Sequence, residues 1–309
     1  MNLELYELII IGGGPAGVSA GVYAARKKMR TLFLTYDFQS QSTVSEDIQN
    51  WIGTVSISGA DFASSMETHL RTYAGEAVSI MKGVKVSNIK KIEGGFEVST
   101  DDNKSFTSKA VLIATGSVRR KLPIKGADVF EHKGLTYCAT CDAPLFGGQD
   151  VVVVGGGNAA FETASQLSSY CKSVTIINRS DKYRADEVTV EKVLAKENVN
   201  SITGADLKEV VGDRFVSGLV YEKNSETVTL PVTGIFVEIG LLPSTDFAKD
   251  IVETNQIGQV VVDPRTQKTK TSGIWAAGDC TDGLYHQNNI SAGDAVKALE
   301  DIYIELHTK

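Results

Sequence analysis

The sequence is poor in the features that mark disulfide-rich and membrane-spanning proteins. It has four cysteines in 309 residues, too few and too scattered for a disulfide scaffold. No apolar run approaches the roughly 18 residues that a membrane-spanning helix needs. The apolar residues Leu8–Ile11 run directly into glycines, without a basic flank or a cleavage site, so we interpret them as a buried strand rather than a signal peptide. These absences predict a cytoplasmic protein, in a reducing compartment and away from the membrane.

The sequence also has fewer basic residues, 31, than acidic residues, 38. The net charge of −7 argues against nucleic acid or an anionic membrane as the main partner. Hydrophobic residues make up 42% and charged residues 22%, which is typical of globular proteins. A chain of this length can form two domains, each with its own core.

The strongest motif is a glycine-rich turn near the N-terminus. An apolar strand over 6–11 is followed by Gly12-x-Gly14-Pro15-Ala16-Gly17, a helix to about Lys28 and a strand over 31–34. In a βαβ unit, the first glycine permits the tight turn, the second lets a pyrophosphate approach, and the third lets the helix pack closely. The motif predicts a dinucleotide site. Thr35 stands where an acidic ribose ligand is usual, so the ribose contact stays open.

Less distinctive segments follow. We expect a helix from Gly59 to about Tyr73, an antiparallel meander over 78–108, and a buried strand over 111–113 that ends at Ala114-Thr115-Gly116. The basic run Arg119–Lys121 predicts a solvated linker.

A second glycine-rich turn occurs halfway along the chain. The strand 150–154 leads into Gly155-x-Gly157-Asn158-Ala159-Ala160, a helix to about Tyr170 and a strand over 173–177. Ala160 satisfies the third position because only a small side chain is needed there. This turn predicts a second nucleotide site.

The two halves, 6–116 and 150–240, share one plan. The strand at 273–277 and its Gly278-Asp279 corner fall outside that repeat. We therefore expect an α/β fold of two Rossmann-like, three-layer (ββα) nucleotide-binding domains, the second inserted into the first. The expected domains are 1–116 plus 246–309, and 117–245.

A Cys-x-x-Cys pair, Cys138 and Cys141, precedes the second turn. In a reducing compartment such a pair is more often catalytic or metal-binding than structural. A zinc site lacks a second close pair, so no metal is predicted. Cys171 and Cys280 are expected to be buried. Two nucleotide turns and one dithiol indicate an enzyme that moves electrons from a dinucleotide to a disulfide. Asp142, beside the pair, suits proton delivery or the N-cap of a following turn.

The ordered motifs Gly12–Gly17, Ala114–Gly116, Cys138-Ala139-Thr140-Cys141-Asp142, Gly155–Asn158 and Ala277-Gly278-Asp279 resemble the low-molecular-weight, bacterial-type FAD-dependent thioredoxin reductases. The likeness covers nearly the whole chain. The segment from Ala185 to Gly240 is also similar to the flavoprotein component of alkyl hydroperoxide reductase.

The resemblance implies FAD in the first domain, NADPH in the second, a homodimer and a thioredoxin-like partner. Cys141 would face the flavin, Cys138 would attack the substrate disulfide, and Asp142 would supply a proton. The implied FAD residues are Gly12, Gly14, Pro15, Ala16, Gly17, Thr35, Gln41, Asn50, Ala114, Thr115, Gly116, Gly278, Asp279, His286, Gln287 and Asn288. The implied NAD(P) residues are Gly155, Gly157, Asn158, Ala159, Ala160, Arg179 and Arg184.

The sequence departs from the family pattern at three places. Gln39-Ser40-Gln41 replaces Gly-Gly-Gln, and His286-Gln287 replaces Arg-Gln. The arginine signature for the 2′-phosphate is reduced to Arg179 and Arg184, so NADH or reduced ferredoxin stays open as the donor. Three alternatives also stay open: a peroxiredoxin or glutaredoxin-like partner, a ferredoxin/flavodoxin–NADP reductase, which would not need the dithiol, and a non-enzymatic redox sensor.

Overall fold

The computed structural model describes residues 5–44, 48–137 and 139–308 and divides the chain into two compact units. The first unit is the chain up to Val118 together with the part from Leu242 onward, and the second is Arg119–Leu241. The divisions fall at 118/119 and 241/242, where the sequence suggested 116/117 and 245/246. The chain passes from one unit to the other in two strands, β7 (Ser117–Arg119) and β16 (Leu241–Pro243), which pair with each other.

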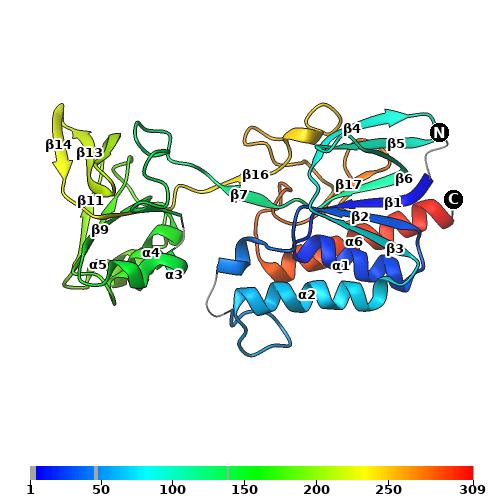
Figure 1. The fold of residues 1–309 in the computed structure, drawn as a ribbon, viewed down its shortest axis with the longest axis horizontal. Helices are drawn as coiled ribbons and strands as arrows, with labels where there is room; N and C mark the ends of the chain where they lie inside the picture. Colours follow the sequence, from blue (N-terminus) through cyan, green and yellow to red (C-terminus); the bar gives the residue numbers. More distant parts are fainter. Residues whose placement is uncertain (1–4, 45–47, 138, 309) are drawn as a thin grey trace. The chain divides into compact units, whose positions relative to one another are not determined.

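The first unit is built on a seven-stranded sheet with the order β3-β2-β1-β6-β5-β4, and β17 also pairs with β6 (Figure 1). Strands β1, β2, β3, β6 and β17 pair in parallel, while β5 pairs antiparallel with β4 and with the first half of β6. The strands are β1 (Leu5–Ile11), β2 (Thr31–Thr35), β3 (Val78–Lys82), β4 (Val86–Ile92), β5 (Gly95–Thr100), β6 (Ser105–Ile113) and β17 (Ile274–Ala276).

Two expectations for this sheet were only partly right: the antiparallel meander begins at β4 rather than β3, and the predicted buried strand at 111–113 belongs to a longer strand. Residues 78–82 do not begin an antiparallel meander, because β3 pairs in parallel with β2. Residues 111–113 are not a separate strand but the end of the nine-residue β6. One edge of β6 pairs with β5 over Ser105–Ser108 and then with β17 over Val111–Ile113, so the strand changes partner halfway.

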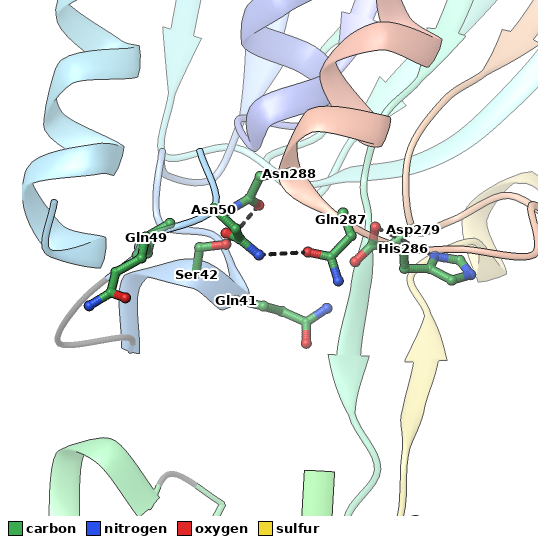
Figure 2. Close-up of a pocket in the computed structure, with 9 residues that line it drawn as sticks. Gln41, Ser42, Gln49, Asn50, Asp279, His286, Gln287 and Asn288 are labelled. Carbon is green, nitrogen blue, oxygen red and sulfur yellow. Dashed lines mark hydrogen bonds and ion pairs between the residues drawn. The ribbon is translucent and has the colours of Figure 1, made fainter. Parts of the chain in front are cut away.

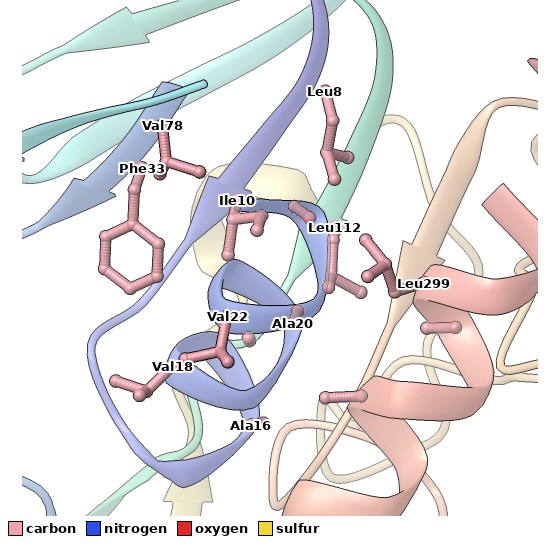
Figure 3. Close-up of a cluster of buried hydrophobic side chains, with 14 of the residues drawn as sticks. Leu8, Ile10, Ala16, Val18, Ala20, Val22, Phe33, Val78, Leu112 and Leu299 are labelled. Carbon is pink, nitrogen blue, oxygen red and sulfur yellow. The ribbon is translucent and has the colours of Figure 1, made fainter. Parts of the chain in front are cut away.

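Strand β1 is buried on both faces, and its side chains alternate between two cores. Leu8 and Ile10 face the helices, together with Phe33 of β2 and Leu112 of β6 (Figure 3). The residues between them, Ile9 and Ile11, belong to a second core that includes strands β4 and β5. The helices are α1 (Pro15–Arg26), α2 (Gly59–Ala74) and α6 (Asn288–His307), with 3-10 helices at Gln41–Val44 and Asp246–Ala248. This arrangement fixes the carboxyl ends of β1 and β17, where the first glycine turn and the Gly278-Asp279 corner lie.

The second unit repeats the plan on a smaller scale. Its parallel five-stranded sheet has the order β11-β10-β9-β15-β8, and a separate antiparallel sheet has the order β12-β13-β14. The strands are β8 (Leu135–Thr136), β9 (Asp150–Val154), β10 (Ser173–Ile177), β11 (Val199–Ile202), β12 (Asp206–Gly212), β13 (Val216–Lys223), β14 (Glu226–Leu230) and β15 (Gly234–Val237). The helices are α3 (Ala139–Asp142), α4 (Asn158–Leu167) and α5 (Glu187–Leu194), with a 3-10 helix at Ala143–Phe146. Helix α5 was not predicted. The fold is a mixed α/β fold with two Rossmann-like domains.

No helix in the described part of the chain is both long enough and apolar enough to cross a bilayer. Cys171 and Cys280 are buried, as predicted. Burial raises the pKa of each thiol to about 11.

Candidate functional site

Gly12 and Gly17, in the turn between β1 and α1, are required by the protein's own packing. Gly12 has a φ of 119°, and a Cβ there would lie 2.2 Å from the backbone oxygen of Ala114. A Cβ on Gly17 would lie 1.8 Å from the oxygen of Gly12. Only glycine therefore lets strand and helix approach this closely.

Gly14 differs, because nothing in the protein requires a glycine there. Its φ is −77°, and an added Cβ would find its nearest neighbour, Ser40 Cβ, at 3.8 Å. Gly14 is the N-cap of α1, and no side chain caps that helix. The space left beside free N–H groups at a helix N-terminus suits a phosphate group.

A polar cavity of about 470 Å³ lies in the same unit (Figure 2). It combines the 3-10 helix at Gln41–Val44, the segment 48–50 and the start of α6. Hydrogen bonds join these segments: Asn50 Nδ2 donates to Gln287 Oε1 at 3.1 Å, and Ser42 Oγ donates to Asn288 Oδ1 at 2.8 Å. Its lining residues are Gln41, Ser42, Ile48, Gln49, Asn50, Asp279, His286, Gln287 and Asn288.

Six of those nine residues were predicted from the sequence as cofactor residues, and they lie together here. Ser42, Ile48 and Gln49 were missed. Their only sequence signal is proximity to Gln41 and Asn50. Polar hydrogen-bonding side chains around a cavity of this size suit a ring system with both carbonyl and N–H edges. The cavity and the open glycine turn therefore fit FAD.

Asp279 and His286 form the charged end of the cavity. Asp279 Oδ1 accepts a hydrogen bond from Ser291 Oγ at 3.1 Å, and His286 Nδ1 lies 3.5 Å from the same oxygen. The hydrogen bond to Asp279 raises the pKa of His286, partial burial opposes it, and the Asp279 charge adds to it. His286 thus supplies a cation that depends on pH.

The remaining candidates of the first unit lie around the glycine turn. Thr35 is buried, and its hydroxyl donates to the oxygen of Asp37, so its side chain serves the turn itself. Thr115 Oγ1 donates to the oxygen of Ser244 at 2.7 Å, and Gly116 has a φ of 63°. Pro15 is the first residue of α1, and Ala16 and Ala114 are both buried.

The second turn repeats the division of roles between its glycines. A Cβ on Gly155 would lie 2.2 Å from the oxygen of Glu238, whereas Gly157 has open space above it. Ala160 is fully buried, and its Cβ would lie 3.1 Å from one on Gly155. Asn158 is tied to Asp186 by two hydrogen bonds of 2.9 Å, and Ala159 is exposed. This turn fits a second dinucleotide phosphate.

The loop after β10 presents two arginines. Arg179 and Arg184 are both exposed, and neither forms an ion pair within the described residues. The backbone N–H of Arg184 donates to the oxygen of Gly156 at 2.7 Å, which places this loop against the glycine turn. Asn178 directly follows β10, and its amide donates to the oxygens of Ser180 and Lys182. The position where an acidic ribose ligand is usual therefore carries a neutral side chain that shapes the loop.

The dithiol segment is described only in part. Cys138 lies outside the described residues, as does the side chain of Cys141, whose backbone belongs to α3. The Asp142 carboxylate accepts a hydrogen bond from Thr136 Oγ1. Asp142 stands at the N-cap of the next 3-10 helix but makes no capping bond through its side chain. Asp142 thus occupies the predicted N-cap position, but its carboxylate does not make the capping bond.

The prediction of a solvated linker was wrong for Arg119. Its Nη1 lies 3.2 Å from Glu238 Oε1 and also donates to the backbone oxygen of Tyr137. Burial raises the pKa of Glu238, while Arg119 and Thr163 oppose that rise. No sequence pattern signals this pair, because its members are far apart along the chain.

The comparisons with known proteins agree with this geometry. A family model for pyridine nucleotide-disulphide oxidoreductases matches residues 6–297. An alkyl hydroperoxide reductase component of Staphylococcus aureus is 38% identical over 96% of this chain and 58% of its own length. The NADH dehydrogenase of Bacillus subtilis is 34% identical over 96% of this chain and 57% of its own length. The chain thus spans less than two thirds of the curated relatives it matches.

Solved structures match over nearly their full length. Lactococcus lactis thioredoxin reductase (FR conformation) has a TM-score of 0.88 at 32% identity, covering 98% of this chain and 100% of that one. The thioredoxin reductase of T. acidophilum has a TM-score of 0.84 at 36% identity, covering 97% and 98%. A ferredoxin-flavin thioredoxin reductase of Clostridium acetobutylicum has a TM-score of 0.53 at 28% identity, covering 99% of each chain.

Proposed function

Because the chain belongs to the pyridine nucleotide-disulphide oxidoreductase family, we propose that it is an FAD-dependent thioredoxin reductase that uses NADPH. The observation that carries this proposal is the repeated division of roles in the two glycine turns. In each turn the first glycine is required by the protein, while the second, Gly14 or Gly157, leaves open space beside a helix N-terminus. Two dinucleotides and one dithiol are the components of electron transfer from a nicotinamide to a disulfide.

In the first unit, FAD would lie with its pyrophosphate at Gly14 and its ring system in the polar cavity. Asn50 and Gln287 hydrogen-bond to each other across that cavity, so both side chains are already oriented. When bound, FAD accepts two electrons from a reduced nicotinamide and passes them to a disulfide. Asp279, fixed by Ser291, would hold the ribityl–pyrophosphate region.

In the second unit, NADPH would lie with its pyrophosphate at Gly157. Arg179 and Arg184 support NADPH over NADH, because guanidinium groups hold a 2′-phosphate well. Asn178 supports the same choice, since it places no carboxylate to repel that phosphate. The name of the Bacillus subtilis relative points to NADH instead, so the donor is the first property to test.

The dithiol completes the reaction. The thiolate of Cys138 would attack a sulfur of the substrate disulfide, forming a mixed disulfide and releasing one substrate thiolate. Cys141 would then attack Cys138, re-forming the Cys138–Cys141 disulfide and releasing the second substrate thiolate. Asp142, whose carboxylate is held by Thr136, would deliver a proton to a leaving thiolate. The cycle consumes one NADPH, one proton and one disulfide, and it yields NADP⁺ and two thiols.

An anaerobic titration of the purified yellow protein tests the proposal. Bleaching of the flavin band by stoichiometric NADPH, more readily than by NADH or reduced ferredoxin, would identify the donor. Thioredoxin turnover that disappears in Cys138→Ser, while NADPH still bleaches the flavin, would identify the acceptor. A protein that cannot be reconstituted with FAD would refute the proposal.

Two alternatives rest on particular relatives. The match to the alkyl hydroperoxide reductase component supports a peroxiredoxin partner, reached through a separate thioredoxin-like module. The ferredoxin-flavin relative supports a donor other than a nicotinamide. Turnover with a peroxiredoxin and module but not with thioredoxin, or bleaching by ferredoxin alone, would favour these alternatives. The proposed homodimer would be seen by sedimentation.

A further inference from the structure

Glu238 stands where the strand order of the second unit's main sheet reverses. The order is β11-β10-β9-β15-β8, so β10 and β11 lie on one side of β9 and β15 lies on the other. Sheets of this kind bind ligands outside the carboxyl ends of the strands at the reversal. Strand β9 ends in the second glycine turn, and Glu238 directly follows β15. The Glu238 N–H donates to the oxygen of Val154 at 2.8 Å, and its own oxygen would lie 2.2 Å from a Cβ on Gly155. Glu238 therefore adjoins the glycine turn.

The direction of a dinucleotide along this edge follows from the same topology. The adenosine ribose lies at the end of the strand after the glycine turn, which here is β10, followed by Asn178. The pyrophosphate lies at the helix N-terminus, where Gly157 leaves open space. A dinucleotide that crosses the reversal then carries its nicotinamide half over β15. Glu238 is the ionisable residue that directly follows this strand.

The Glu238 carboxylate is held by two other elements of the unit. Thr163 Oγ1 of α4 donates to Glu238 Oε1 at 3.1 Å, and Arg119 Nη1 of β7 lies 3.2 Å from the same oxygen. The Glu238 side chain is 14% exposed, so it is shielded from water without being enclosed. Burial raises the pKa of Glu238, Arg119 and Thr163 oppose that rise, and the charge of Glu162 adds to it. A carboxylate kept against its desolvation cost is typical of a functional group.

The nicotinamide ring changes its charge in the reaction. Loss of a hydride turns the neutral ring of the reduced nucleotide into the cation of the oxidised one. A carboxylate in shielded surroundings acts strongly on a nearby charge, and it acts much less on a neutral ring. We propose that Glu238 faces the nicotinamide half of the nucleotide and favours the oxidised, cationic ring over the reduced, neutral one. The inference rests on the proposed function in taking the second unit as the nicotinamide site.

Calorimetric titration of the FAD-loaded, oxidised protein tests this inference. NADP⁺ supplies the cationic ring, and tetrahydro-NADP supplies a neutral ring that cannot donate a hydride. We call the Kd of tetrahydro-NADP divided by the Kd of NADP⁺ the charge preference. Glu238→Gln keeps the shape of the side chain and removes its charge, so we expect it to lower the charge preference about threefold or more.

A third ligand and two further variants separate charge from folding. Adenosine 2′,5′-bisphosphate lacks the nicotinamide, so its Kd should be the same in Glu238→Gln as in the unsubstituted protein. Glu238→Asp keeps the negative charge and should retain most of the charge preference. Glu222→Gln is the matched control. Glu222 lies on β13 of the separate antiparallel sheet, is 42% exposed and pairs with Lys208, so its replacement should leave the charge preference unchanged.

An unchanged charge preference in Glu238→Gln, or an equal rise in Kd for all three ligands, would overturn the inference and leave the ion pair a structural role. If Glu238→Gln does not fold, Thr163→Val decides, because it removes a hydrogen bond that holds the carboxylate in place. A charge preference lowered by a smaller factor in Thr163→Val supports the inference, and an unchanged one refutes it.

Failure of the proposed function has a different signature. If NADP⁺ does not bind but NAD⁺ does, the proposed donor is wrong, and NAD⁺ with tetrahydro-NAD then decides the inference in the same way. If no nicotinamide nucleotide binds, the proposed function and the inference fail together. Binding with an unaltered charge preference in Glu238→Gln defeats the inference alone.

Discussion

His286 and Asp279 meet at the charged end of the flavin-sized cavity, with His286 Nδ1 3.5 Å from Asp279 Oδ1. The same carboxylate oxygen accepts the hydrogen bond of Ser291, so its position is fixed by α6. The His286 imidazole is therefore the member of the pair whose charge changes, because histidine titrates within the physiological pH range.

The first prediction concerns the pH dependence of stability. Because the folded-state pKa of His286 is raised above its ordinary value of 6.5, the pair's contribution is fully present below pH 6.5. It is lost as the pH rises through the raised pKa. Partial exposure limits it to about 0.5 kcal/mol. We expect His286→Gln to lower the Tm by about 1–2 °C at pH 6 and by less at pH 8.5.

The exposed His69 provides the control for this prediction. His69→Gln should give no such difference between the two pH values. Thermal unfolding followed by circular dichroism at both pH values would measure the effect. An equal loss of Tm by His286→Gln at both pH values would show that the histidine acts through packing rather than charge.

The second prediction separates two glycines of one turn. Gly14→Ala places its Cβ in open space, so we expect an unchanged fold but weaker FAD binding, by about tenfold or more. Gly17→Ala places its Cβ 1.8 Å from the oxygen of Gly12, so it should displace α1 and destabilise the whole first unit. Circular dichroism and FAD titration measure the two effects. Unchanged FAD affinity in Gly14→Ala would mean that the pyrophosphate lies elsewhere.

The third prediction concerns the electron donor. Replacing Arg179 or Arg184 with alanine should raise the KM for NADPH about five- to tenfold, since each loses one charge-assisted contact to the 2′-phosphate. The KM for NADH should change little, because that nucleotide lacks the phosphate. Lys182→Ala, on the same exposed loop, provides the control. Equal increases in KM for NADPH and NADH would show that the arginines bind a part of the nucleotide that both molecules share.

The fourth prediction concerns proton delivery at the dithiol. Asp142→Asn keeps the shape of the side chain but removes the acid, and it should lower turnover with thioredoxin by about 100-fold or more. Thr136→Val removes the hydroxyl that holds the carboxylate, and it should have a smaller effect of the same sign. Reduction of the flavin by NADPH, followed by stopped-flow absorbance, should be unchanged in both.

A surface carboxylate of the same unit controls for general charge effects. Asp206 pairs with Lys208 in solvent, so Asp206→Asn should leave turnover unchanged. If Asp142→Asn turned over thioredoxin at the unsubstituted rate, the proton delivered at the dithiol would come from solvent rather than from Asp142.

Elements with local causes could be predicted from the amino-acid order alone. A glycine required at Gly12 or Gly155, the helix that follows it and the buried strand before it all depend on residues within about 20 positions, so spacing and apolar pattern predict them. Some of the polar residues around the cavity could also be predicted, because short motifs resemble those of a known family.

Which segments lie next to each other could be learned only from the folded domain. Apolar patterns indicate strands in the regions of β3 and β6, but not that β3 pairs in parallel or that β6 changes partner halfway. The pairing of Arg119 with Glu238 depends equally on the closure of the second unit's sheet. The tendency of a residue to be buried depends on the polarity of its own side chain, which the sequence states directly. Which distant residue it contacts depends on how the whole domain packs.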